Sequence, residues 1–286
     1  MTASSNPSNA DEISALWLRQ ARQWAHIGPP LRPVAEDLRL LERLAEEAFA
    51  GAGVARRALL LGVTQEIATM HWPADTTLVA VDRSLAMITE LWPGGTVDIR
   101  RYAVNADWRM LPVADRSVTI IIGDGSYSAL DTLAGQDAMS AEIVRALAPE
   151  GRLAIRLYAR PEKVETTDAV FDDLRSGRIG SFHAFKWRLA MSLPMDDDFS
   201  VRVGDVWDAW QAARIDGEEL ARRCGWPPTA VQTIASYRDN DTRYTFPPLS
   251  VVRQRFAGFF QEIGYFKPSY EIGDRCPTLL LTPKMS

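Results

Sequence analysis

The sequence predicts an α/β protein built on a parallel, doubly wound sheet. Short apolar runs recur along the first half of the chain, and segments with the apolar spacing of helices separate them. The clearest run is 58–61; Gly62, a short helical segment and a second run at 78–81 that ends in Asp82 follow it. Strands this apolar are buried on both faces, and strands that alternate with helices pair in parallel. An acid at the tip of the second strand, about 20 residues after a glycine turn, is placed to bind the two hydroxyls of a ribose.

The composition indicates a globular protein without nucleic acid or membrane partners. The chain has 286 residues, of which 47% are apolar, and a net charge of −5, which disfavours polyanions. No apolar run approaches the roughly 18 residues that a membrane helix needs. The N-terminus lacks the basic and apolar regions of a signal peptide. Because Cys224 and Cys276 are the only cysteines, we expect reduced thiols and a cytoplasmic location.

Further elements follow from the same patterns. Helices are expected over 11–50, with a break at 28–30 where Gly-Pro-Pro occurs. A third strand is predicted at 97–103, a fourth, β-branched throughout, at 118–122, and a fifth at 152–157. Ligands of such sheets bind outside the carboxyl ends of the strands, so the polar residues that follow each strand are the candidates for a site.

The alternation of strands and helices stops at residue 159. The segment 159–244 is amphipathic and helical, without a clear strand, and its length favours an inserted helical layer over a loop. A helix over 251–263 and two strands at 267–272 and 278–281 come next, and the short connection between these strands requires an antiparallel pair. The expected organisation is a tail with a helical cap (1–56), a cofactor-binding α/β core (57–158), the insertion as a substrate lid (159–244), and a last helix and strand pair that completes the core (245–286).

Four features in this order resemble the class I S-adenosylmethionine-dependent methyltransferases. They are the glycine turn after the first strand, Asp82 after the second, Asp107 and Trp108 after the third, and the Leu-Ala-Pro-Glu-Gly-Arg-Leu sequence at 147–153 before the fifth. The closing helix and strand pair also look like the last elements of that family. The resemblance implies a Rossmann-like sheet of seven strands with the last one antiparallel. It also implies S-adenosyl-L-methionine as the cofactor and in-line transfer of a methyl group to a small-molecule acceptor.

The resemblance further implies roles for single residues. Gly62 and its turn would approach the methionine part of the cofactor, and Asp82 would hold the ribose hydroxyls. Asp107 would accept a hydrogen bond from the adenine amino group, with Trp108 beside the ring. Carboxylates and an aromatic ring suit the hydroxyl pair, the exocyclic donor and the flat ring of adenosine. The implied cofactor-binding set is Gly62, Val63, Thr64, Asp82, Arg83, Met87, Asp107, Trp108, Gly123, Asp124, Gly125 and Ser126.

The glycine turn departs from the family pattern. The family usually has three glycines, with an acid just before the first. Here only Gly62 remains, Leu60 stands in the acid position, and Thr64 and Glu66 stand where glycines are common. Three outcomes stay open: Thr64 and Glu66 contact the cofactor through their side chains, the turn follows another path, or cofactor binding is lost. The same turn argues against a nicotinamide enzyme, whose pyrophosphate site uses Gly-x-Gly-x-x-Gly.

On the acceptor side the sequence offers candidates by position. A general base is required if the acceptor is a hydroxyl or a protonated amine. Tyr127 and Tyr158 near strand ends and His183 in the insertion are candidates, with Trp187 as a wall of the pocket and Arg188 as a second polar group.

Other chemistries are less favoured by the sequence. No metal site is expected, because the run of aspartates at 196–198 lacks calcium-loop spacing. Two alternative functions remain: aminopropyl transfer from the decarboxylated cofactor, and a non-catalytic methyltransferase-like binding module with an altered glycine turn.

Overall fold

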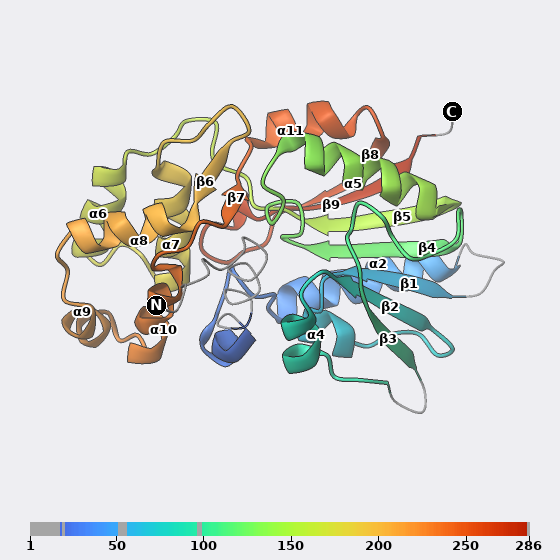
Figure 1. Ribbon diagram of the computed structural model, residues 1–286, viewed down its shortest axis with the longest axis horizontal. Helices are drawn as coiled ribbons and strands as arrows, with labels where there is room; N and C mark the ends of the chain where they lie inside the picture. The colour runs from blue at the N-terminus through green and yellow to red at the C-terminus, as the bar shows by residue number, and fades with distance from the viewer. Residues whose placement is uncertain (1–17, 19–20, 51–55, 96–98, 285–286) are drawn as a thin grey trace, which may run out of the picture.

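A single seven-stranded sheet forms the centre of the molecule (Figure 1). The computed structural model describes residue 18 and residues 21–50, 56–95 and 99–284. The strands are β1 (Arg57–Leu61), β2 (Thr77–Asp82), β3 (Arg100–Asn105), β4 (Val118–Asp124), β5 (Leu147–Arg156), β8 (Phe260–Phe266) and β9 (Thr278–Pro283). Their order is β3-β2-β1-β4-β5-β9-β8, and β9 is antiparallel to both of its neighbours. The predicted fold class is therefore confirmed.

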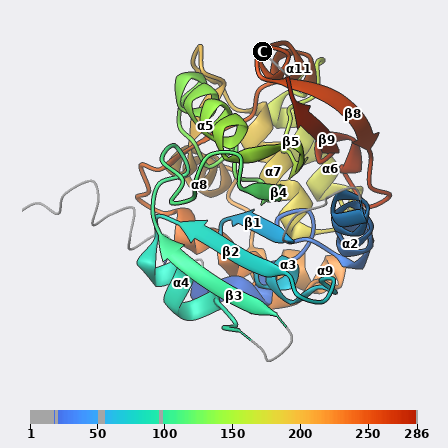
Figure 2. The same ribbon diagram turned by 90° about the vertical axis from the view of Figure 1, so that its right-hand side faces the viewer.

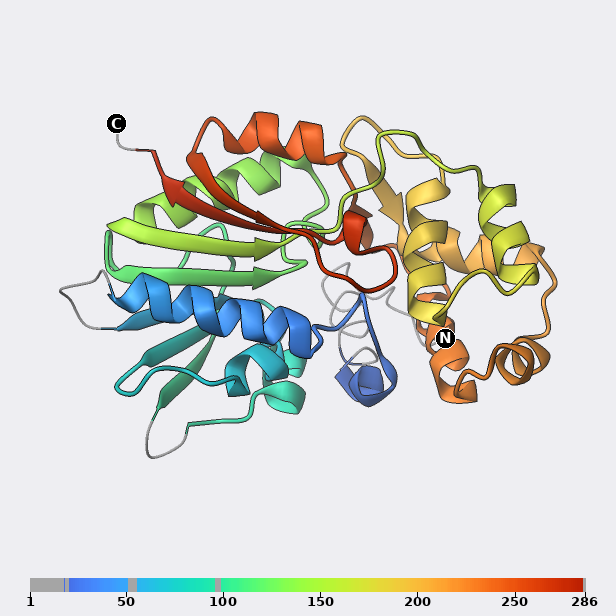
Figure 3. The ribbon, with the colours of Figure 1, turned by 180° about the vertical axis from the view of Figure 1, so that it is seen from behind.

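Helices cover both faces of this sheet. On one face lie α2 (Ala35–Ala50), α3 (Gln65–Thr69) and α4 (Leu85–Leu91); on the other lie α5 (Leu133–Ala146) and α11 (Leu249–Phe256). Figure 3 shows α2 crossing the back of the sheet, and Figure 2 shows α5 on the opposite side. Because successive side chains of a strand point to opposite faces, Leu60 packs with Leu44 of α2 whereas Leu59 packs with Ile143 of α5. All four are buried, so β1 needs apolar residues on both of its faces after the exposed Arg57.

The segment between β5 and α11 forms a second layer beyond the carboxyl ends of the strands (Figure 1). Its central helix is α7 (Phe182–Ser192), of which every residue from 182 to 191 is buried. The other elements are α6 (Thr167–Arg175), β6 (Ser200–Arg202), α8 (Val203–Ala212), α9 (Gly217–Cys224), α10 (Pro228–Gln232), η2 (Thr233–Tyr237) and β7 (Arg243–Thr245). The expectation of a purely helical segment is wrong, because β6 and β7 pair as a small antiparallel sheet. Three-residue strands show no alternation in sequence, and their pairing is not local.

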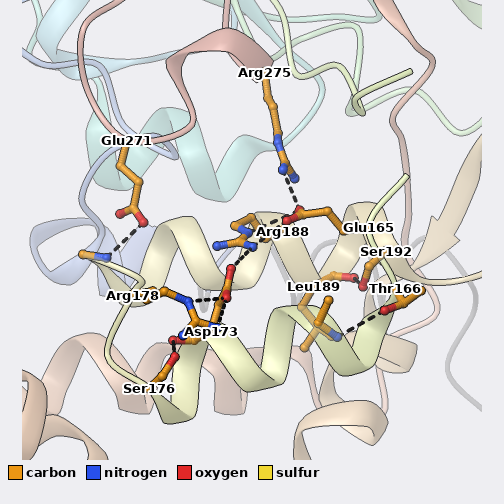
Figure 4. Close-up of polar contacts among 12 residues, drawn as sticks. Glu165, Thr166, Asp173, Ser176, Arg178, Arg188, Leu189, Ser192, Glu271 and Arg275 are labelled. Atoms are coloured by element: carbon orange, nitrogen blue, oxygen red, sulfur yellow. Dashed lines mark hydrogen bonds and ion pairs between the residues drawn. The ribbon is translucent and has the colours of Figure 1, made fainter. Parts of the chain in front are cut away.

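Ion pairs join the insertion to itself and to the C-terminal part of the chain (Figure 4). Arg188 of α7 donates to Glu165 and to Asp173 of α6, and Arg275 donates to the same Glu165. Arg275 belongs to η3 (Gly273–Arg275), just before β9. The carboxylate of Glu271 accepts hydrogen bonds from backbone amides at the start of α7, at positions 180 and 181. These contacts fix α7 against the edge of the core.

The C-terminal elements differ from the sequence-based expectation. The predicted helix over 251–263 ends at Phe256, and the first strand of the last pair is β8 rather than 267–272. The pairing of β8 with β9 shifts register between Glu262 and Gly264, which places a bulge in β8 at the expected end of that helix. The apolar residues around Phe260 fit either period, and only the pairing with β9 decides between them.

Smaller differences concern boundaries. The third strand was expected at 97–103 and runs from 100 to 105, with 97 and 98 outside the described residues. The fifth strand was expected to begin at 152. In the structure β5 begins at Leu147, and its register with β4 shifts before Arg152. In the N-terminal part, 21–23 is helical, η1 (Trp24–His26) follows and the break at 28–30 is confirmed; the expected helix before it lies mostly outside the described residues. None of the helices in the described ranges is both long and apolar enough to cross a membrane.

Candidate active site

A cavity of about 1100 Å³, counting its open mouth, lies between the carboxyl ends of the strands and the insertion. Three parts of the chain line it. The core contributes Leu61, Gly62, Val63, Thr64, Asp82, Arg83, Met87, Trp108, Asp124, Gly125, Ser126, Ser128, Ala129 and Tyr158. The N-terminal segment contributes Gln23, Trp24, Ile27 and Leu31, and the insertion contributes Lys186, Trp187, Thr233, Ser236, Tyr237 and Tyr244.

Asp82 ends β2 and lines the cavity as a buried carboxylate. Its Oδ1 accepts a hydrogen bond of 2.7 Å from the backbone N–H of Ser84, whereas Oδ2 accepts none from the described residues. Burial raises the pKa of Asp82 to about 6, although the bond from Ser84 and the charge of Arg83 act in the opposite direction. A buried carboxylate with a free oxygen at a cavity is suited to accept hydrogen bonds from a ligand.

Gly62 begins the turn beside Asp82. Its φ of +104° lies in a region that favours glycine, and its N–H donates to the carbonyl of Val81 at 2.8 Å. A Cβ on Gly62 would lie 3.9 Å from both Asp82 Oδ2 and Trp108 Cζ2. The indole N–H of Trp108 donates to the same Val81 carbonyl, which holds the ring beside the turn. The backbone, the carboxylate and the ring therefore form one continuous wall.

Two residues of the predicted cofactor set do not line the cavity. The carboxylate of Asp107 accepts from the backbone N–H and the guanidinium of Arg109, and these hydrogen bonds lower the pKa of Asp107. Gly123 is packed in the core, where a Cβ would lie 2.4 Å from Ile155 Cδ1. The other predicted cofactor residues do line it. The role of Asp107 toward adenine stays a prediction.

The altered glycine turn faces the N-terminal segment. Oε1 of Glu66 accepts a hydrogen bond of 3.1 Å from the Trp24 indole and another from Arg32. Thr64 lines the cavity, but its hydroxyl does not cap α3. Of the two residues that replace family glycines, Glu66 thus binds the segment that covers the turn, and Thr64 is the one exposed to a ligand.

We expect Glu66→Ala to loosen residues 24–32 from the turn. It removes two hydrogen bonds to the Glu66 carboxylate, one of them also an ion pair with Arg32, for a cost in folding free energy of about 1–2 kcal/mol. Hydrogen exchange of the backbone amides of 24–32 should accelerate. Glu47→Ala is the control, since Glu47 forms exposed ion pairs with Arg43 and Arg152. Equal exchange in both variants would show that Glu66 does not hold the segment.

The two tyrosines proposed on the acceptor side have different surroundings. The structure does not bring Tyr127 to the cavity: its ring packs on Phe256 of α11, and its hydroxyl lies 2.8 Å from Ser140 Oγ. Tyr158 lines the cavity beside Gly125, whose φ is +65° and on which a Cβ would lie 2.3 Å from Tyr158 Cε2. The Tyr158 hydroxyl donates to the carbonyl of Pro30 at 3.0 Å, and burial raises its pKa well above the ordinary value. Neither tyrosine is therefore arranged as a general base.

His183 and Arg188 lie outside the cavity as well. Nε2 of His183 donates to the carbonyl of His26 at 2.9 Å, so the ring holds the N-terminal segment against α7. Burial, followed by the charge of Lys186, lowers the pKa of His183 to about 3, which keeps it neutral. Arg188 is bound to carboxylates in the network of Figure 4. Trp187, in contrast, lines the cavity as expected.

Lys186 is the functional candidate that the sequence analysis missed. It is 2% exposed, lines the cavity, and donates a hydrogen bond of 2.9 Å to Thr233 Oγ1. The sequence does contain an indication of this role, because Lys186 is the single lysine in a helix that is otherwise largely apolar on every side. A helix apolar all round is buried, and a lysine is almost never fully buried unless it is paired.

No protein-family model and no curated protein matches the chain. Solved structures do match it. A Rhodobacter sphaeroides protein provisionally described as a Zn-dependent alcohol dehydrogenase aligns with a TM-score of 0.58 and 11% identity, over 97% of this chain and 100% of that one. The N-methyltransferase NodS of Bradyrhizobium japonicum with S-adenosyl-L-homocysteine gives a TM-score of 0.45 and 11% identity, over 94% and 99%. A TehB-like S-adenosylmethionine-dependent methyltransferase of Corynebacterium glutamicum gives 0.44 and 12%, over 94% and 99%.

The strand order decides the fold. An antiparallel strand, β9, lies between two strands that run with the rest of the sheet. The chain has the Rossmann-like fold of the class I S-adenosylmethionine-dependent methyltransferases. In this methyltransferase fold, the part of the chain that the structure describes contains no group of three or more His, Cys, Asp or Glu side chains that could hold a metal ion.

Proposed function

We propose that this chain is an S-adenosylmethionine-dependent methyltransferase with a small-molecule acceptor. The observation that carries the proposal is the Asp82 carboxylate at the tip of β2, with a free oxygen beside Gly62 and the Trp108 ring. A ribose offers two adjacent hydroxyls to such an oxygen, and an adenine ring offers a face to an aromatic side chain. Because Gly62 has no side chain, the rest of the cofactor can approach the backbone of this turn closely.

The lining of the cavity also suits a ligand. Small-molecule sites are lined mostly by apolar and aromatic side chains with a few polar groups, and here Trp24, Trp187 and Tyr244 lie beside Asp82 and Ser126. Ser126, which follows β4, also lines the cavity. Its hydroxyl is buried next to Gly123 and bonds to no described residue.

The zinc alcohol dehydrogenase description of one similar structure does not transfer to this chain. Dinucleotide-binding sheets have the order 3-2-1-4-5-6 and a Gly-x-Gly-x-x-Gly turn. Here β9 lies next to β5, and Val63 and Thr64 follow a single glycine. The strand order and the turn therefore favour a methyltransferase over a dinucleotide-binding enzyme.

The protein's part in the reaction is to bind, orient and exclude water. When bound, S-adenosyl-L-methionine supplies a methyl group that is already activated on a sulfonium sulfur. Asp82 and Trp108 would fix the adenosine, and the Gly62 turn and Ser126 would border the methionine part. The N-terminal segment, held by Glu66 and Tyr158, covers part of the cavity and would exclude water there. Positioning and desolvation of this kind account for much of the rate of such displacements. We propose that the insertion, 159–244, provides the acceptor half of the pocket.

Calorimetric titration of the purified protein tests the proposal. We expect S-adenosyl-L-methionine and S-adenosyl-L-homocysteine to bind with micromolar dissociation constants. NAD⁺ serves as the control ligand and should give no heat of binding. If neither sulfur compound binds, the chain is a non-catalytic module that keeps the fold without the cofactor.

A further inference from the structure

The amine of Lys186 lies in the half of the cavity that the insertion builds. Lys186 comes from the middle of α7, and its Nζ lies 2.9 Å from Thr233 Oγ1 and 5.0 Å from the centre of the Tyr237 ring. Both neighbours belong to η2 and line the same cavity. Lys186 is thus buried next to an aromatic ring, yet it is one of the residues that line the cavity.

No carboxylate of the described residues pairs with this amine. The charged groups that line the cavity besides Lys186 are Asp82, Arg83 and Asp124. Asp124 accepts from Arg156 at 2.6 Å, and Asp82 and Arg83 lie in the proposed cofactor half. On the same helix as Lys186, His183 is neutral and Arg188 is bound to Glu165 and Asp173. From η2, the ring of Tyr237 faces Lys186. Burial without a counter-charge lowers the pKa of Lys186 to about 7.

Near Lys186, the hydrogen-bonding groups that are still free to bind a ligand are mainly N–H donors. Thr233 Oγ1 accepts from Lys186 and donates to the carbonyl of Ala230, and Ser236 Oγ donates to the carbonyl of Thr233. Two N–H groups of a protonated Lys186 are left over. Trp187 lines the same cavity, and its buried indole N–H donates to no described residue. Unused N–H groups on a buried cation call for an acceptor group with negative charge.

We propose that Lys186 binds a carboxylate of the methyl acceptor, so that the cavity takes small aromatic or apolar acids. This inference rests on the proposed function. Two carboxylate oxygens match the few free donors, whereas a phosphate would leave several of its oxygen lone pairs without a partner. A cationic acceptor would be repelled by the same amine. The aromatic lining, with Trp187, Tyr237 and Tyr244, suits an apolar body attached to the acid.

The cofactor has a carboxylate of its own, so the test separates the two sources. The protein saturated with S-adenosyl-L-homocysteine is titrated with benzoate, 4-hydroxybenzoate, phenylacetate and indole-3-acetate, and with the uncharged amide of each acid. We expect at least one acid to bind at least tenfold more tightly than its amide. Equal affinities for every pair, or no binding of any acid, would overturn the proposal.

Lys186→Met removes the amine at similar volume, and Lys163→Met, at an exposed position, is the matched control. We expect Lys186→Met to lose the preference for acids over amides and to keep its affinity for S-adenosyl-L-homocysteine within about threefold, while Lys163→Met behaves as the wild type. A tenfold loss of S-adenosyl-L-homocysteine affinity in Lys186→Met would assign the amine to the cofactor and overturn the proposal. Failure of the wild type to bind S-adenosyl-L-homocysteine would refute the proposed function instead, and the acid and amide pairs would then be titrated into the free protein.

Proton uptake provides a readout that needs no variant. At pH 8 an amine with a pKa near 7 is mostly neutral, and a bound carboxylate favours its charged form. Binding of an acid should therefore take up most of one proton, measured as the dependence of the calorimetric heat on the ionisation enthalpy of the buffer. Acid binding without proton uptake would contradict a contact with Lys186, even if Lys186→Met does not fold.

Discussion

Asp82→Ala is expected to weaken binding of S-adenosyl-L-methionine by about 2–4 kcal/mol, because it removes charge-assisted hydrogen bonds to two hydroxyls. Titration calorimetry with S-adenosyl-L-homocysteine measures the loss. Folding should survive, since Asp82 lies at the end of β2 and burial disfavours its charged form in the folded protein. A folded Asp82→Ala protein that binds like the wild type would mean that the cofactor site lies elsewhere.

The raised pKa of Asp82 makes the affinity for the cofactor depend on pH. Hydrogen bonds to ribose hydroxyls need the ionised carboxylate, so cofactor affinity should fall as the pH drops through about 6, the pKa that burial gives Asp82. In Asp82→Asn this part of the pH profile should be absent. A profile that is the same in both proteins would assign the titration to another group.

The stability of the ligand-free protein should show the opposite trend. A carboxyl whose pKa is raised from 3.8 to about 6 on folding favours the folded state fully below pH 3.8, and this contribution is lost as the pH rises through 6. Asp82→Asn should therefore be more stable than the wild type at pH 8, with the difference shrinking toward pH 4. Urea unfolding at several pH values measures it.

Arg156→Met is expected to destabilise the fold by about 3–5 kcal/mol, the usual cost of removing one partner from a buried ion pair. Arg156 is 2% exposed at the end of β5, where its Nε donates to Asp124 at 2.6 Å. Its Nη1 donates to the carbonyl of Pro30 and to the hydroxyl of Tyr270, and it lies 3.9 Å from the buried Asp37. Loss of the guanidinium leaves two buried carboxylates without a counter-charge.

A neighbouring arginine provides the matched control for this variant. Arg152 lies on the same strand, but its ion pair with Glu47 at 3.5 Å is partly exposed. Arg152→Met should cost less than about 1 kcal/mol. Adding Asp124→Asn to Arg156→Met should recover part of the lost stability, because it removes one of the unpaired charges. Similar unfolding free energies for the two single variants would show that the buried network contributes little.

The sequence was sufficient where structure depends on local pattern. The strands around Leu60, Ala80 and Ile121 are apolar on both faces, so a short run identifies each of them. The carboxyl ends of parallel strands meet at one edge, and Asp82, Trp108 and Ser126 accordingly line one cavity. The order of a few polar residues along the chain was enough to locate this edge.

The remaining features depend on contacts between distant segments. Nothing near Glu66 in sequence reveals that Trp24 and Arg32 bind it, and nothing near His183 reveals the His26 carbonyl. Lys186 was overlooked because a lysine between aromatic residues in sequence can equally face water. The burial of Lys186 depends on η2, which lies more than forty residues later in the sequence and packs over the amine.

The placement of β9 has a consequence for synthesis of the chain on the ribosome. The N-terminal strands can pair as they emerge, but the outer edge of β5 binds β9, whose first residue is Thr278. Until β9 has left the ribosome, the backbone donors and acceptors beside Ile155 do not have the partner that β9 provides, and such an edge can pair with other chains. The whole insertion is made during this interval. A nascent chain of this protein therefore exposes this sheet edge to aggregation until β9 covers it.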